Sequence, residues 1–353
     1  MDPFSQAALG AVVGQAVGHA RLGYRAAAIG ALAGALPDVD VLFSLNGDYF
    51  DQLVTHRGIT HSLFFAPAAG PLLAFVVWKL EARRRGHDPD ERRRLAAWTW
   101  VVTLALLSHP LLDYLTPYGT QLLLPFSNAR FAVNAMPIID PAYTLMLFLG
   151  LAVAGWIYRA AASRIALVTL ALSCSYLAYG GYLNVAAERE AVRQLRAAGV
   201  AGAEVAAFPT VLQVHYRRVV ARTAHDDRVG FISMWRPCDI AWSAAPREDP
   251  DSDPVKAFLA TREGRIFDWF TMGWARYRVE PTVSGSRVRA TDLRYGFTDD
   301  PDLSIFNASA VVDLAGRLVE PVSAGRDAAD ATGQRLALLF QDTYAAACTL
   351  AAS

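Results

Sequence analysis

The apolar residues of this 353-residue chain are concentrated before residue 185, and this uneven distribution limits its possible folds more than any other feature. Hydrophobic residues make up 54% of the sequence and charged residues 19%, so the chain is more apolar and less charged than a typical soluble protein. A helix of about 20 apolar residues crosses a bilayer. Six segments approach that length: Phe4–Ala20, Tyr24–Phe43, His61–Leu80, Leu95–Leu115, Ile139–Tyr158 and Ile165–Leu183. We therefore expect an all-α membrane domain of about six helices.

The rest of the chain has a different pattern. Ala186–Gly199 is typical of an amphipathic helix, Val211–Arg222 alternates like a strand, and Gly333–Leu350 predicts a closing helix. A chain of this length has room for two domains. We expect a membrane domain over residues 1–184 that carries the functional site, and a smaller α+β soluble domain over residues 185–353.

The basic residues predict the orientation in the membrane. One set of short connections between the apolar segments holds eleven Lys and Arg residues, most of them in 81–94, and the opposite set holds only Arg57 and Arg130. Because basic connections stay in the cytoplasm, 81–94 is expected there, with the C-terminal domain outside. Lys plus Arg and Asp plus Glu are both 33, so the neutral chain gives no support for a nucleic-acid partner.

The three cysteines are too few for a disulfide framework. We interpret Cys174, Cys238 and Cys348 as packing residues. The alternative is a bridge between Cys238 and Cys348.

Six ionisable residues lie at the ends of the apolar segments, where such residues are costly and usually mark function. They are Asp38 and Asp40 in Leu36–Asp40, His56 and His61 in His56–Ser62, and His109 and Asp113 in Ser108–Asp113. The expected topology places all six at the outer membrane face. His109 and Asp113 share one helix face, because they are four residues apart. Imidazole and carboxylate together suit Zn, Mn or Fe, and six ligands suffice for one or two such ions.

Each of these residues also has a simpler interpretation. Asp38 could lie in a helix-end turn, and Asp40 could be a carboxylate at the membrane interface. His56 could pair with Asp51, and His61 could cap a helix. His109 and Asp113 could form a structural hydrogen bond as helix neighbours. A shared depth for all six is harder to explain in this way, so we favour a metal site.

Several other polar residues are weaker candidates. Gln6 and Asp140 lie on the same expected side, and whether either joins the site stays open. Arg57 is expected to bind an anionic part of the substrate, such as a phosphate. The remaining histidines, which are His19, His87, His215 and His225, are left outside the site.

The motifs resemble a known family. Met1–Gly10, Leu36–Asp40, His56–Ser62 and Ser108–Gly119 are similar to segments of the YdjM-type membrane-bound metal-dependent hydrolases of bacteria, over about residues 1–185. The His-Arg-Gly-x-Thr-His-Ser motif is the most specific part of this likeness. The resemblance implies a bacterial inner membrane protein with hydrolase activity, in a longer branch that carries a C-terminal soluble domain. Some members have a histidine where this chain has Gln6.

A fainter likeness suggests a substrate class. Asp40, His56, His109 and Asp113 follow the ligand order of zinc-dependent phospholipase C and the related single-strand nucleases, although the further ligands of those enzymes are missing here. By analogy, this order points to a phosphoester.

We therefore expect a membrane-bound metal-dependent hydrolase that acts on a membrane lipid or lipid-linked phosphoester. The expected ligands are Asp38, Asp40, His56, His61, His109 and Asp113. They would hold one or two divalent ions, with Zn before Mn or Fe, which would activate a water molecule. Asp38 or Asp113 is the expected general base, and Arg57 the anion-binding group. The alternative is a non-enzymatic, metal-stabilised membrane scaffold whose soluble domain binds a protein partner that the sequence does not identify. A transporter ranks last, because the polar residues gather at one face.

Overall fold

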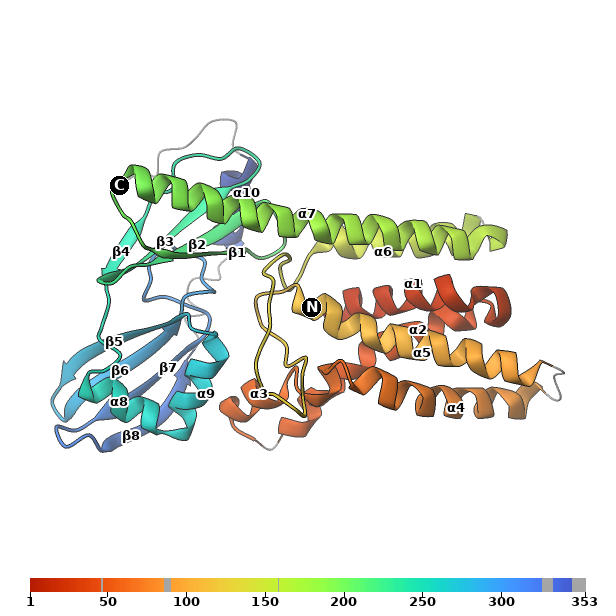
Figure 1. Cartoon of the computed structure of the whole chain (residues 1–353), viewed down its shortest axis with the longest axis horizontal. Coiled ribbons are helices and arrows are strands. Elements are labelled where there is room, and N and C mark those ends of the chain that lie inside the picture. The colour runs from red at the N-terminus through yellow and green to blue at the C-terminus, as the bar shows by residue number, and fades with distance from the viewer. Residues whose placement is uncertain (46, 86–89, 158, 326–332, 345–353) are drawn as a thin grey trace. The chain divides into compact units, whose positions relative to one another are not determined.

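The computed structural model describes residues 1–353 except 46, 86–89, 158, 326–332 and 345–353 (Figure 1). The chain forms two compact units. The first contains Met1–Asn46 and Thr55–Tyr179, and the second contains Gly47–Val54 and Gly180–Ser353. The predicted fold class is confirmed, since a helical membrane region precedes a domain of helices and antiparallel sheets.

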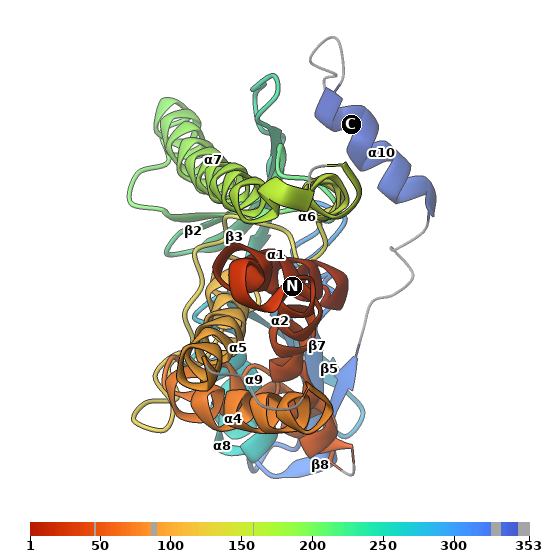
Figure 2. The ribbon, with the colours of Figure 1, turned by 90° about the vertical axis from the view of Figure 1, so that its right-hand side faces the viewer.

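The first unit is built of helices and one long irregular segment. Its elements are α1 (Pro3–Leu22), α2 (Arg25–Ala35), η1 (Leu36–Ser44), η2 (Ile59–His61), α4 (Phe65–Arg85), α5 (Glu91–Tyr114), α6 (Pro141–Ala152), η3 (Val153–Ile157), η4 (Arg159–Ala161) and the start of α7 (Ala162–Ala197). Helices α2 and α6 both lie beside α1, and α4 lies beside α5 (Figures 1 and 2).

Four helical stretches in the described part of the chain are long and apolar enough to cross a membrane, compared with the six segments that we expected. They are Arg25–Ser44, Phe65–Arg84, Glu91–Tyr114 and Ala162–Ala197. Helix α6 is shorter, and the polar residues Gln6, Gln15 and His19 interrupt α1. The number of candidate spans in the described residues is therefore four and not six, because α6 is too short and α1 is interrupted by polar residues.

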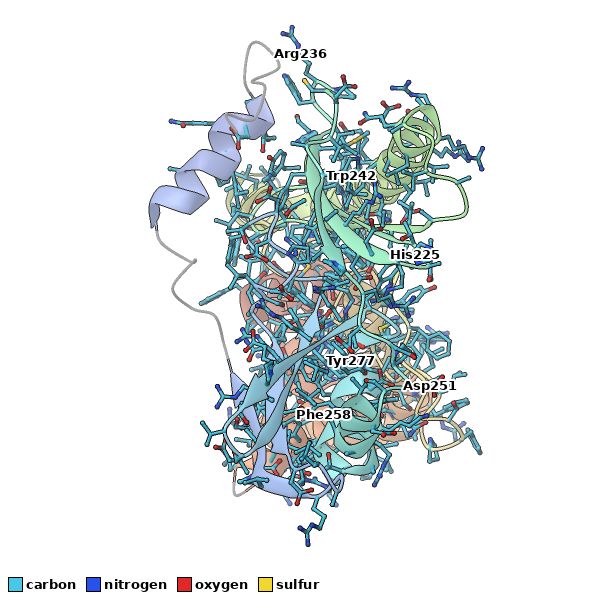
Figure 3. All side chains as sticks on the ribbon, turned by 90° about the vertical axis from the view of Figure 1, so that its left-hand side faces the viewer. His225, Arg236, Trp242, Asp251, Phe258 and Tyr277 are labelled. Carbon is cyan, nitrogen blue, oxygen red and sulfur yellow. The ribbon has the colours of Figure 1, made fainter. Side chains whose placement is uncertain are left out.

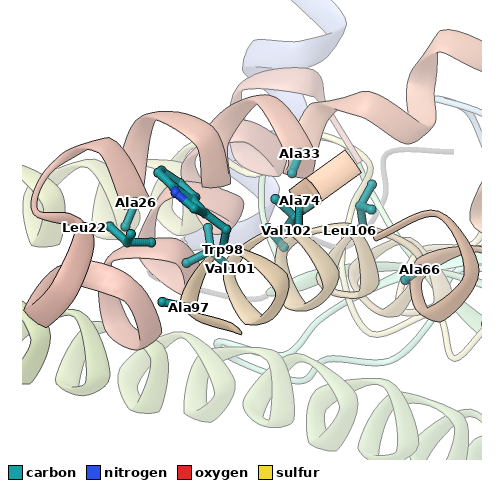
Figure 4. Packing of buried hydrophobic residues seen from close by; sticks show 11 residues of the cluster. Leu22, Ala26, Ala33, Ala66, Ala74, Ala97, Trp98, Val101, Val102 and Leu106 are labelled. Carbon is teal, nitrogen blue, oxygen red and sulfur yellow. The ribbon is translucent and has the colours of Figure 1, made fainter. Parts of the chain in front are cut away.

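Small residues bring α1 and α2 into backbone contact. A Cβ atom added at Gly10 would collide with the carbonyl oxygen of Gly30, and one added at Gly14 with that of Ala26. Apolar packing continues onto α5, where buried Trp98 and Val101 contact the cluster that includes Ala26 (Figure 4). Close contact of this kind is typical of helix pairs in lipid, where dispersion replaces the hydrophobic effect.

The second unit contains two four-stranded antiparallel sheets. One has the order β1 (Glu204–Pro209), β2 (Tyr216–Arg222), β3 (Asp226–Ser233), β4 (Ser243–Pro246), and the other has the order β5 (Ala275–Thr282), β6 (Gly285–Asp292), β7 (Asn307–Val312), β8 (Leu318–Gly325). Ala187 and Ala191 of α7 pack on Ala207 and Val219 of the first sheet. The helix predicted over 186–199 is thus the end of α7, which begins in the first unit.

The remaining helices of this unit are short. They are α3 (Tyr49–Thr55), α8 (Asp253–Ala260), α9 (Arg262–Thr271) and α10 (Gly333–Tyr344). Thr261 separates α8 from α9, because its hydroxyl caps α9 by accepting from the Gly264 amide. The Phe258 ring on α8 contacts Tyr277 on β5, with 6.3 Å between ring centroids (Figure 3). The predicted closing helix is described only as far as Tyr344.

The cysteines differ from our interpretation. Cys238 is disulfide-bonded, and Cys174 is a free thiol exposed on α7. Neither is therefore a buried packing residue. Cys348 lies outside the described residues.

The contact between α1 and α2 can be tested by a single methyl group. Gly14→Ala is expected to lower the thermal midpoint in detergent, because overpacking against a backbone carbonyl costs about 1–3 kcal/mol. Gly155→Ala is the matched control, since a Cβ atom there meets no other atom within 4 Å. Differential scanning fluorimetry compares the two variants. Equal midpoints would contradict the backbone contact.

Candidate metal centre

Four side chains from three separate stretches of the first unit converge on one point. They are Asp38 on η1, His61 at the end of η2, and His109 and Asp113 on α5, and one ligand atom of each lies within 4.8 Å of the other three. Both histidines and Asp113 are fully buried, whereas the Asp38 side chain is 22% exposed. The helical spacing of His109 and Asp113 places both on the same side of α5.

The other ring nitrogen of each histidine is already engaged. His109 Nδ1 lies 2.6 Å from the Gly34 carbonyl oxygen, and His61 Nδ1 lies 3.1 Å from both Thr60 Oγ1 and Asp40 Oδ2. A carbonyl and a carboxylate only accept, and the Thr60 hydroxyl already donates to Asp40, so each Nδ1 donates and each Nε2 of a neutral ring carries a lone pair. These two Nε2 atoms face each other at 3.0 Å. Two facing acceptors in a buried position need a cation or a proton between them.

The distances to the carboxylates fit a metal ion. His61 Nε2 lies 3.3 Å from Asp113 Oδ2 and 3.6 Å from Asp38 Oδ1, and His109 Nε2 lies 3.6 and 3.3 Å from the same atoms. A tetrahedral ion with bonds of about 2.0–2.1 Å separates its ligands by about 3.3 Å. Asp113 Oδ2 is buried and pairs with the Arg57 guanidinium, but it accepts no hydrogen bond from the residues that the structure describes. The donor set and its spacing therefore suit a divalent metal such as zinc.

The structure places Asp40 and His56 beside this group and not in it. Asp40 Oδ1 lies 2.9 Å from His56 Nδ1, and Asp40 Oδ2 accepts from the Arg57 amide at 2.8 Å and from the Thr60 hydroxyl at 3.2 Å. Both oxygens of Asp40 are thus occupied. Asp40 holds the ring of His61, as carboxylates commonly hold metal-binding histidines. His56 is 28% exposed and pairs with Asp40, in place of the alternative partner Asp51.

Arg57 and Gln6 hold Asp113. Arg57 Nε lies 3.0 Å from Asp113 Oδ2, and its Nη1 donates to Thr116 Oγ1 at 2.7 Å. Gln6 Nε2 donates to Asp113 Oδ1 at 2.9 Å, and the Met1 amino group also contacts this oxygen. Gln6 is fully buried, and its Oε1 has no hydrogen-bond partner among the residues that the structure describes. Gln6 therefore contacts the Asp/His group directly.

Asp140 has a different role. It caps α6 by accepting from the Tyr143 amide at 2.9 Å, and it accepts from the Tyr176 hydroxyl at 3.0 Å. His19 lies near the other end of α1, against Tyr24, and His215 and His225 lie in the second unit. His87 lies outside the described residues.

The His56–Ser62 motif is fixed mainly by backbone contacts. Arg57 has a φ of 60°, in the left-handed region, which turns its amide toward Asp40. The irregular segment after α5 covers the motif, because Gln121 donates its amide to the Arg57 carbonyl and Leu63 donates its amide to the Leu122 carbonyl. The sequence did not predict that Thr60 donates to Asp40 or that the Gly34 carbonyl holds the His109 ring. Thr60 stands in the motif, but a backbone carbonyl has no sequence signal.

The fold and this site define a helical membrane protein with a buried His/Asp group that could hold a metal. The model of the YdjM inner membrane protein family matches residues 1–187, which is more than half of the chain. The chain belongs to this family, and its apolar helices agree with an inner membrane location.

Two relatives carry the same likeness. The chain is 32% identical to inner membrane protein YbcI of Escherichia coli (strain K12) over 129 residues, which cover 36% of this chain and 69% of YbcI. It is 28% identical to the uncharacterized protein YfhP of Bacillus subtilis (strain 168) over 117 residues, 32% of each chain. The match thus spans about a third of YfhP. No solved structure matches the chain.

The four convergent ligands and the neighbouring residue Asp40 are expected to differ in their effect on metal binding. His61→Ala, His109→Ala and Asp113→Ala should remove the bound ion. Asp40→Ala should keep it but weaken binding about 10–100-fold, because it frees the His61 ring without removing a ligand. Metal content of the detergent-purified protein, followed by chelator competition, measures both effects.

His19→Ala is the control, since it removes an imidazole of α1 away from the site. Full metal content in both His61→Ala and Asp113→Ala would show that the site is wrong.

Proposed function

We propose that the chain is a multi-pass, membrane-bound metal-dependent hydrolase in which Asp38, His61, His109 and Asp113 hold one divalent ion, with zinc as the first candidate. The observation that carries this proposal is the pair of Nε2 atoms that face each other at 3.0 Å while both Nδ1 atoms are engaged. One ion agrees with four convergent ligands better than two, because Asp40 and His56 bind each other.

An ion in this position would supply Lewis-acid activation of water and of a phosphoryl oxygen. Asp113 is unsuited to accept a proton, since Arg57 and Gln6 contact its two oxygens inside the protein. Asp38 is the carboxylate of the group that reaches the surface. We assign the role of general base to Asp38, where it would take the proton from the attacking water.

Arg57 is better suited to hold Asp113 than to bind a substrate anion. Its side chain is buried, pairs with Asp113, donates to Thr116 and lies 4.7 Å from the centre of the Tyr118 ring. A charged group held in this way is preorganised and would keep the Asp113 carboxylate in place. This role replaces the anion-binding role in the proposal.

A lipid or lipid-linked phosphoester is the proposed substrate. Val39, next to Asp38, and Ile59, in the histidine motif, both expose apolar side chains. The η1 segment that carries Asp38 also belongs to the apolar stretch Arg25–Ser44. The exposed ligand is therefore flanked by apolar surface, which favours a substrate that arrives from the membrane over a freely soluble one.

A metal-stabilised scaffold is the second candidate function. Four protein ligands fill a tetrahedral shell, and closed shells are typical of structural zinc sites, whereas catalytic sites keep a position for water. The partial exposure of Asp38 is the feature that favours catalysis, because this ligand can exchange for water at the surface.

Asp38→Asn separates the two functions. In a hydrolase it should keep most of the metal, through the remaining ligands, and lower turnover at least about 100-fold, because the general base is lost. Release of the phosphorylated headgroup from phospholipid vesicles and nitrophenol release from bis(4-nitrophenyl) phosphate are the assays. Asp90→Asn, outside the site, is the matched control.

The scaffold makes different predictions for the same proteins. Zinc-loaded wild type would be inactive in both assays, and removal of the metal would lower only the thermal midpoint. This result would contradict the proposed hydrolase.

We also propose that the second unit lies outside the cytoplasm. The excess of basic residues in one set of connections supports this orientation. The disulfide of Cys238 also supports it, because disulfides persist in oxidising compartments.

A reporter fused after Ser353 tests this orientation. Alkaline phosphatase, which needs an oxidising compartment, should be active there, and green fluorescent protein exported in the same position should stay dark. The opposite pattern would overturn both the orientation and the outer position of the metal centre.

A further inference from the structure

A second candidate site lies on the other side of α1 from the metal centre. It is a groove with a volume of about 380 Å³, lined by α1, α2, α6 and the start of η3. Phe4, Ala8, Ala11 and Gln15 line it from α1. These positions form one stripe of the helix, and Gln6 falls on the opposite side. The groove is thus separate from the Asp/His group.

The surrounding contacts keep this groove open. Alanines of α1 and α2 form much of its lining and are too short to fill it. Helices α1 and α2 are already in backbone contact at their glycines, so they cannot move closer together. Helix α6 is held at its first turn by the Ser5–Thr144 hydroxyl contact of 2.5 Å and by the Asp140 cap. Neither boundary can readily close over the space.

Among the described residues, Gln15 is an unsatisfied polar group of this groove. It is 2% exposed and lines the groove, and its Oε1 has no hydrogen-bond partner in the described part of the chain. A buried acceptor without a donor is costly in apolar surroundings. The occupant should therefore be mainly apolar and should bring one hydrogen-bond donor to the Gln15 end.

The dimensions favour a single narrow chain over a helix as the occupant. From Phe4 to Gln15 the groove follows eleven residues of α1, about 16 Å. A helix of that length and about 10 Å in diameter occupies about 1,200 Å³. This exceeds the empty space of the groove, which is about 780 Å³ with its open side included. A single hydrocarbon chain is narrow enough, and exposed Phe4, Tyr24 and Phe148 leave the groove open to the outside of the unit.

We propose that this groove binds one hydrocarbon chain of a membrane lipid, with a hydroxyl or amide N–H of that lipid donating to Gln15 Oε1. The chain lies along the alanine lining toward Phe4, and the polar end lies near Gln15 and Tyr24. This site is independent of the proposed hydrolase and does not require a metal.

Two probes that differ in one feature test the proposal. Monomyristin has a single acyl chain and free hydroxyl groups, and methyl myristate has the same chain without a donor. Native mass spectrometry of the full chain in detergent should show one bound monomyristin, with affinity roughly tenfold above that of methyl myristate. Gln15→Leu should abolish this preference and still bind the chain. Equal affinity of both probes for the wild type would overturn the proposal.

Filling the groove gives an independent test. Ala28→Phe and the milder Ala31→Leu should reduce binding of both probes at least tenfold, whereas Leu32→Phe, on the exposed side of α2, should bind like the wild type. Thermal midpoints show that each variant is folded. Unchanged probe binding in both filled variants would overturn the proposal. It would also be overturned if light scattering showed that the filled variants change oligomeric state while they still bind the probes. The latter result would assign the groove to a second copy of the chain.

Discussion

The arrangement of the first unit depends on two imidazole rings that cannot face each other without a positive charge between them. Each ring is fixed through Nδ1, His109 by the Gly34 carbonyl and His61 by Asp40, so neither Nε2 can turn away to another partner. The carboxylates of Asp38 and Asp113 approach the same point, and two like charges this close together favour a cation between them. A divalent ion at this point would satisfy all four groups together.

The packing of α1 against α2 brings the partners of this group into reach. A Cβ atom added at Gly34 would meet the Gln6 carbonyl oxygen and the backbone of Gly10, so a side chain there would force the two helices apart. The same Gly34 offers its carbonyl to His109, and the same Gln6 donates to Asp113, both on α5. Close contact between small residues therefore lets two neighbouring helices bind two successive turns of a third. The small residues of these helices, which resemble ordinary membrane packing, are also what positions the site.

The sequence could predict which ionisable residues lie close together, but not which of them are candidate metal ligands and which only support those ligands. Positions at the ends of apolar segments indicate depth, and depth placed Asp38, Asp40, His56, His61, His109 and Asp113 together. Asp40 lies beside the four ligands and not among them, because η1 is a 3-10 helix after Pro37 and because the Arg57 backbone amide donates to Asp40. Neither of these backbone features can be recognised from a pattern of residues in the sequence. The amphipathic stretch over 186–199 was recognised as helical. The continuity of α7 from Ala162 was not, because a change in hydrophobicity along one helix looks like a domain boundary.

Helix α1 shows why hydropathy undercounts the helices of this unit. Its low hydropathy comes partly from Gln6 and Gln15, which are both buried. In the described part of the chain, each has an Oε1 without a hydrogen-bond partner, one beside the Asp/His group and the other in the apolar groove on the opposite side. A helix that contacts a polar cluster on one side and a narrow groove on the other has little surface facing bulk lipid, so it does not need a uniformly apolar sequence. The polar residues that exclude α1 from the apolar spans are the same ones that give this helix its two proposed functions.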